Sequence, residues 1–394
     1  MENTKMNNKS ILKCNSLEEW LEKQPDDAFP KYYPNRGEKS YQDKYKDLKK
    51  ALVGYHNSVE LGAMLASIDK WHQELRDEIS QLKKVSTEDV DERIKDLEER
   101  VQNDPIIYLN QHGVGHVEKV IEKVLEIIKK YRSEYPTASE IFILLCAIQI
   151  HDIGNINGRE GHETSFQETF RDIAKNIIPD AVTQKNIIRI AQVHSGSIGG
   201  SKDTIREAQL QENKTWFTQR IREPMLAALL RFGDELADDS SRYDKIALES
   251  NKISERSKIY HEYSKSLHAV NIFDNEINKM NCYVSLEYYV DTKALTVEYP
   301  CDGGSILLID EIFNRTRKME QERRYCMRFL SPYISLTEIR VAIEIEPENM
   351  IMESEKIMYT LSEKGYPSSD IIIDCNTNTG EGVKAYLKEK GWRI

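Results

Sequence analysis

Residues 141–150 are apolar on nearly every side of a helix. Such a helix leaves no face for water, so it belongs at the centre of a helical bundle. Ser139 is positioned to cap its start. The run stops at His151-Asp152, and Gly154 follows as a candidate left-handed helix cap. The sequence therefore predicts a buried helix whose end carries a histidine and an aspartate.

Apolar residues recur at helical spacing on both sides of this run. The segment between residues 1 and 45 is polar, and three prolines interrupt it. Pro224 suits the first turn of the last helix of the bundle. We expect helices at residues 46–84, 87–101, 116–132, 163–178, 183–194 and 223–238.

Beyond residue 280 the apolar period changes from helical to alternating. Residues 284–290 alternate, turn at 291–293 and continue to 299, which predicts a hairpin. A helix at 306–330 and a strand at 339–345 follow. The tail indicates a helix (353–364), a strand (370–374) and a helix (380–390), which with strand 339–345 would form a βαβα unit. The fold class predicted is mainly α, a helical bundle with a C-terminal α+β lobe.

The length of 394 residues predicts more than one structural unit. We expect an N-terminal helical extension (1–105), a helical domain (106–270) and the α+β lobe (271–394). The formal charge of −11 argues against a nucleic-acid coat or an anionic-membrane binder. Six cysteines without a CxxC pair indicate free thiols, and the sequence shows neither a signal peptide nor a run of 18 apolar residues. A cytoplasmic location is expected.

Histidines are concentrated in one part of the chain. Of nine, five fall between residues 112 and 194, at predicted helix ends or loops. Asp234 lies within a predicted helix, among apolar neighbours, where an unpaired carboxylate would be costly. Mixed imidazole and carboxylate groups suit Mn, Fe, Zn, Co or Ni better than Ca. One or two such ions are expected. The histidines concerned are His112, His116, His151, His162 and His194.

The order His116, His151-Asp152, Asp234 resembles the HD-domain superfamily of metal-dependent phosphohydrolases. The flanking sequences HVEKV, HDIGN and LLRFGDELAD carry this resemblance over about residues 106–240. It implies an HD-type helical bundle that hydrolyses phosphomonoesters, phosphodiesters or nucleoside triphosphates. The sequences YLNQHGVGH and HDIGNINGREGH also resemble HD modules of bacterial stress or conflict systems.

The resemblance also implies roles for individual residues. His116, His151, Asp152 and Asp234 would hold one metal ion. His162 and His194 would hold a second ion, with Asp152 as the bridge, and a metal-activated water would attack phosphorus. We expect catalytic roles for Asp152, His194 and His112, and substrate phosphate contacts from Arg159, Lys202 and His112.

Several alternatives stay open. His112 is the rival of His116 as a ligand, and His162 and His194 could be solvated residues at helix ends. The chain lacks the GYP motif of the cyclic di-GMP branch and has Asn155 where that branch has lysine, which argues against that substrate.

The leading hypothesis is hydrolysis of a small phosphorylated substrate, a nucleotide or nucleotide-derived signal, by a protein that could form homo-oligomers. The alternative is a non-catalytic nucleotide sensor that signals to a protein partner. Nuclease action is disfavoured by the acidic charge.

Overall fold

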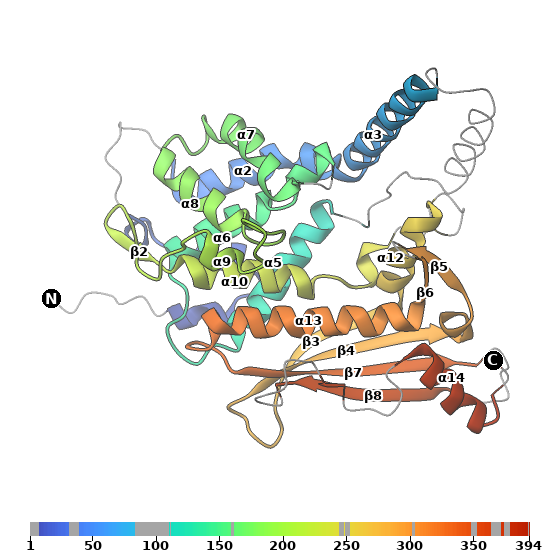
Figure 1. Cartoon of the computed structure of the whole chain (residues 1–394). Helices are drawn as coiled ribbons and strands as arrows, with labels where there is room; N and C mark the ends of the chain where they lie inside the picture. The colour runs from blue at the N-terminus through green and yellow to red at the C-terminus, as the bar shows by residue number, and fades with distance from the viewer. Residues whose placement is uncertain are drawn as a thin grey trace.

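The helical bundle lies on one face of a mixed β-sheet (Figure 1). The computed structural model describes residues 8–30, 39–82, 110, 112–158, 161–243, 248, 253–301, 304–347, 353–363, 372–373, 379–392 and 394. This arrangement confirms the mainly α fold with a C-terminal α+β region. The helix expected at 87–101 lies outside the described residues, and the domain limits at 105 and 270 stay a prediction.

Helix α6 (Ala138–Ile150) is the axis of the bundle, and every one of its residues is buried. By length and hydropathy Ala138–Asn157 could cross a membrane, but 94% of the window tested is buried, so the protein core accounts for its apolar character. Its neighbours are α1 (Leu17–Glu22), α2 (Tyr41–His56), α5 (Val114–Lys129), α8 (Ala181–Ala191) and α10 (Glu223–Leu236).

The caps of α6 differ from the prediction. Thr137, not Ser139, caps the helix, because its hydroxyl accepts from the Glu140 amide while the Glu140 carboxylate accepts from the Thr137 amide. Gly154 is not a left-handed cap either: it lies in the 3-10 helix η3 (Ile153–Asn157). Glycine is needed there because a Cβ would overlap the carbonyl oxygen of His162, at the start of α7 (His162–Ala174).

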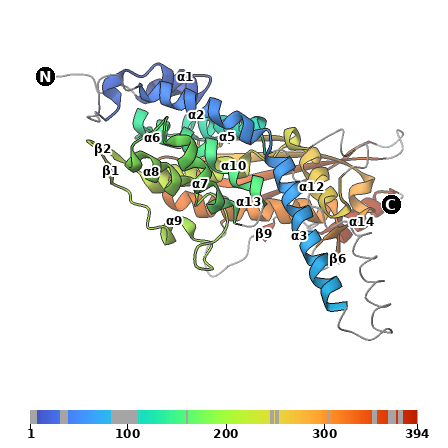
Figure 2. The same cartoon turned by 90° about the horizontal axis from the view of Figure 1, so that it is seen from above.

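The N-terminal part packs against this bundle. The 3-10 helices η1 (Asn8–Lys13) and η2 (Asp26–Ala28) flank α1. The predicted helix 46–84 is two helices, α2 and α3 (Val59–Leu82), because the chain breaks at Asn57 and Ser58. Helix α3 begins beside η3 and then projects away from the bundle (Figures 1 and 2).

Short elements connect α8 to the sheet. The small helix α9 (Thr204–Glu207) and a two-stranded ribbon, β1 (Lys214–Trp216) with β2 (Gln219–Ile221), precede α10, and Pro224 lies in its first turn as predicted. After α10 come η4 (Ser240–Arg242) and α12 (Glu255–Ser266).

The sheet has the strand order β3-β4-β7-β8-β9. Strand β4 pairs antiparallel with β3 and parallel with β7. The predicted hairpin is therefore wrong: after β4 the 3-10 helix η5 redirects the chain, and β5 pairs with β6 instead. The bounds are β3 (Leu267–Asp274), β4 (Cys282–Asp291), η5 (Thr292–Leu295), β5 (Glu298–Cys301), β6 (Gly304–Leu307), β7 (Leu336–Glu346), β8 (Glu355–Ser362) and β9 (Ile372–Ile373).

The helix predicted at 353–364 is also wrong. Strand β8 occupies this segment, since Ile357, Tyr359 and Leu361 are buried at a period of two. The tail is thus not a βαβα unit, although β9 and α14 (Gly380–Glu389) fall where a strand and a helix were expected.

Helix α13 (Leu308–Leu330) lies between the sheet and α10 (Figure 1). Its buried Arg323 forms an ion pair with Glu320 and donates to the carbonyl oxygen of Leu336 in β7. On the other side Arg231 of α10 donates two hydrogen bonds, of 2.6 and 2.7 Å, to Glu322. The α13 helix therefore joins the two layers.

The close approach at Gly154 gives a first prediction. We expect Gly154→Ala to lower the free energy of unfolding by about 1–3 kcal/mol, because the added methyl group must displace the start of α7. Urea unfolding of the variant measures this loss. Gly54→Ala in α2 is the control: nothing lies within 4 Å of its Cβ position, so a gain of up to about 1 kcal/mol is expected. Equal effects of the two variants would contradict the assignment.

Candidate metal centre

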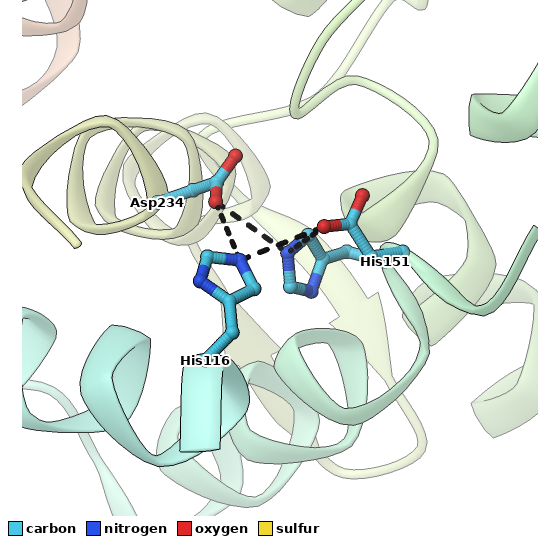
Figure 3. A group of neighbouring side chains, drawn as sticks. His116, His151 and Asp234 are labelled. Carbon is cyan, nitrogen blue, oxygen red and sulfur yellow. Dashed lines mark ion pairs between the residues drawn. The ribbon is translucent and has the colours of Figure 1, made fainter. Parts of the chain in front are cut away.

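Six of the predicted ligand residues meet at one point of the bundle. Each lies at or near the start or end of a helix, and Asp234 lies in the last turn of α10. Figure 3 shows His116, His151 and Asp234 directed toward one another from three separate helices. The other three are Asp152, which follows α6, His162, which opens α7, and His194, which follows α8.

The first group consists of His116, His151, Asp152 and Asp234, and its ligand atoms all lie within 4.8 Å of one another. The Oδ1 atom of Asp234 is 3.1 Å from His116 Nε2 and 3.6 Å from His151 Nε2. The Oδ2 atom of Asp152 is 3.5 and 3.4 Å from the same two nitrogens. Two carboxylates and two imidazoles thus surround one point.

The second group shares Asp152. Its other oxygen, Oδ1, is 3.7 Å from His162 Nε2 and 3.6 Å from His194 Nε2. The rings of His151 and His194 lie with centroids 5.0 Å apart, so the two groups are adjacent. Ser195, which the sequence did not single out, places its Oγ 3.2 Å from His162 Nε2 and 3.1 Å from His194 Nε2.

Backbone carbonyls orient two of the rings. His151 Nδ1 donates to Ile148 O and His194 Nδ1 donates to Ala191 O, each at 2.7 Å. A neutral imidazole that donates through Nδ1 keeps a lone pair on Nε2. Both lone pairs would then face the oxygens of Asp152, which is a repulsive arrangement unless a proton or a metal ion lies between them. Asn155 supports the carboxylate by donating to its Oδ1 at 3.0 Å.

The buried charges shift the pKa values of the group. Burial alone would lower the pKa of His151, but the carboxylates of Asp152 and Asp234 outweigh it and raise the pKa to about 9. Burial would raise the pKa values of both aspartates, but the imidazoles around them, His151 and His116 foremost, hold them well below the usual range. The two carboxylates therefore retain their negative charge and attract a cation.

These residues fit a transition-metal ion. With ligands at about 2.1 Å, neighbouring donor atoms are spaced ~3.0–3.5 Å apart, close to the separations in the first group. His116 and His151 also have buried Nε2 atoms without a hydrogen-bond partner. Buried nitrogens of this kind are expected where an ion completes their coordination.

The remaining predicted site residues lie differently. His112 lies beside the first group, with its Nε2 4.0 Å from Asp152 Oδ2, the same oxygen that faces His116 and His151. Lys202 is exposed on the wall of the neighbouring cleft. Arg159 lies outside the described residues.

A cleft of about 500 Å³ opens over Asp152, His162, His194 and Asp234. Its far wall is α13, whose Arg315, Lys318 and Arg328 line it, and Arg242 of η4 lines it as well. Sequence reasoning missed these cations. The signal available was the spacing of 315, 318, 322 and 325, which puts polar side chains on one face of a predicted helix.

Comparison with known proteins agrees with this geometry. Residues 104–298 match the HD-CE family model, so this part of the chain is an HD-type domain. Its His/Asp cluster is compatible with an HD-type metal site. Searches among curated proteins and among solved structures returned no match. Helix α13 begins beyond the matched residues.

The sharing of Asp152 predicts the metal stoichiometry. We expect two transition-metal ions per chain in the native protein and about one in either His194→Ala or His151→Ala, because each variant removes an imidazole from one of the two groups. Elemental analysis after dialysis measures the content. Two ions retained in His194→Ala would exclude the second group as a metal site.

The shifted pKa of His151 predicts how the metal-free protein responds to pH. Its folded pKa of about 9 exceeds its ordinary value of 6.5, so the folded state holds the extra proton between these values. The contribution of this proton to the free energy of unfolding is fully present below pH 6.5 and is lost as the pH rises through 9. Urea midpoints of chelator-treated protein should therefore fall over this range. Added Zn²⁺ should abolish this fall in the midpoints, because the ion replaces the proton on His151. A rise in the midpoints of the metal-free protein with pH would contradict the assignment.

Proposed function

We propose that this protein is a metal-dependent phosphohydrolase that cleaves a phosphoester or phosphoanhydride bond of a nucleotide or nucleotide-derived signal. One observation carries the proposal: the two oxygens of a single buried carboxylate, Asp152, face separate sets of imidazoles. This is the arrangement required of a bridging ligand between two ions. The match of residues 104–298 to an HD-type family supports the same reading.

The side chains of the metal centre would have separate roles in this reaction. His116, His151, Asp152 and Asp234 would hold one ion, and Asp152, His162 and His194 a second. When bound, Mn, Fe, Zn, Co or Ni lowers the pKa of a water molecule toward neutrality and withdraws charge from a phosphoryl oxygen. The backbone carbonyls of Ile148 and Ala191 keep His151 and His194 aimed at this point.

The cleft favours a small substrate over a polymer. Its volume of about 500 Å³ lies in the range of small-molecule sites. The protein carries a net charge of −11, and this negative charge would repel a nucleic acid that approached the cleft. A soluble phosphorylated compound is the substrate class consistent with both properties, and we expect the protein to act on it in the cytoplasm.

Release of phosphate tests the proposal. We expect metal-loaded protein to release phosphate, pyrophosphate or a nucleoside monophosphate from a member of a panel of nucleoside mono-, di- and triphosphates, cyclic nucleotides and dinucleotides. Asp152→Asn should reduce kcat by at least about 10³-fold, because it removes a charge shared by both ions. Ion chromatography of the products provides the measurement.

Asp172→Asn is the matched control, since the Asp172 side chain on α7 is 82% exposed and forms a local ion pair with Lys175. Its activity should equal that of the native protein. Binding of a nucleotide to metal-loaded native protein without any product would instead favour the non-catalytic sensor.

A further inference from the structure

Arg242 occupies a distinctive position in the cleft. It lies in η4, a few residues after α10 delivers Asp234, and its side chain is 12% exposed. Its Nη2 donates to His112 Nε2 at 2.9 Å, and its Nη1 is 3.6 Å from Asp238 Oδ1. The guanidinium group therefore lines the same cleft as Asp152 and Asp234 and is tied to a residue next to them.

The hydrogen bonds of His112 define its protonation state. Nδ1 contacts the carbonyl oxygen of Asn110, which only accepts, so Nδ1 carries a proton. Nε2 contacts the guanidinium group of Arg242, which only donates, so Nε2 carries a lone pair. His112 is thus a neutral imidazole with both nitrogens engaged. Its backbone amide is fixed as well, because it donates to Glu60 Oε1 at 2.6 Å.

This state bears on two roles that a histidine beside a metal centre can have. A metal ligand would need the Nε2 lone pair that Arg242 occupies, and a general base would need it to accept a proton. The same lone pair is well suited to holding a guanidinium group in place. His112 therefore acts on the cleft through Arg242.

Three other cations of the cleft pair directly with carboxylates. Lys318 contacts Glu235 at 2.6 Å, Arg231 contacts Glu322 at 2.6 Å, and Arg328 contacts Asp203 at 3.0 Å. Arg242 donates to the imidazole of His112 at 2.9 Å, and its Nη1 is 3.6 Å from Asp238 Oδ1. Arg242 is distinguished from them by its contact with His112, whose Nε2 lies 4.0 Å from Asp152 Oδ2, so it lies beside the metal centre.

We propose that Arg242 binds the phosphoryl group of the substrate beside the metal centre, and that His112 is the positioning residue that holds Arg242 there. The inference rests on the proposed function for its ligand class, a phosphate ester or anhydride. A planar guanidinium fork matches two phosphoryl oxygens. The end of α10 supplies the geometry, because the ligand Asp234 lies in its last turn and the anchor Asp238 follows two residues after the helix ends.

Binding of inorganic phosphate to metal-loaded protein, measured by calorimetry, tests the role of Arg242 without turnover. We expect Arg242→Gln to weaken phosphate binding by about 10- to 100-fold, the range for loss of a charge-assisted contact. Its metal content should not change. Arg220→Gln, which removes the same charge from an exposed position in β2, should bind phosphate like the native protein.

Three results would overturn the inference: unchanged phosphate affinity in Arg242→Gln, loss of metal from that variant, or no phosphate binding by the metal-loaded native protein. These results are distinct from failure of the proposed function. A protein that hydrolyses nothing can still bind phosphate through Arg242, and an active protein can prove not to use Arg242.

A pair of variants tests His112. His112→Leu removes the acceptor and should weaken phosphate binding, and raise KM for a substrate, as much as Arg242→Gln does. His112→Gln can accept from Arg242 through its side-chain oxygen, so it should restore affinity to within about threefold of native. Both should keep their metal and their unfolding midpoints. Loss of metal in both variants would show that His112 is a ligand and would overturn its positioning role.

Discussion

The buried carboxylate of Asp152 is the interaction on which the site depends. A negative charge removed from water is tolerated only when opposite charge surrounds it, and here His116, His151, His162 and His194 all direct nitrogens at its two oxygens. The fully buried helix α6 ends at Ile150, two residues before Asp152, so the charge lies where the core meets the cleft. The bundle is consequently built to place one anion among imidazoles.

The parts predicted best are those determined by local pattern. Helices α5, α6, α8, α10 and α13 follow directly from apolar spacing, and the six ligand candidates came together because each occupies a helix end or face. The assignments that failed depended on pairing between distant segments. Nothing near residue 291 shows that β4 will pair with β3 and β7. The alternating segment of β8 is so short that its apolar residues can also be fitted to a helical period.

The cations of the cleft escaped prediction for a related reason. Arg242 and the basic residues of α13 are far from the histidines in sequence. They line the same cleft because α13 packs against α10. Likewise, the demand for glycine at position 154 comes from the start of α7, eight residues later, and not from the end of α6. Sequence spacing locates ligands on elements, whereas close tertiary contacts decide what surrounds them.

Helix α13 belongs to both the cleft and the β-sheet layer. It forms one wall of the cleft, yet it is anchored to the β-sheet through Arg323 and Leu336, outside the residues that match the HD-CE family. The width of the cleft is therefore set by how α13 is seated on the sheet. A graft of the helical bundle alone would carry the metal ligands but leave the cleft open on one side, so the sheet is an integral part of the binding site.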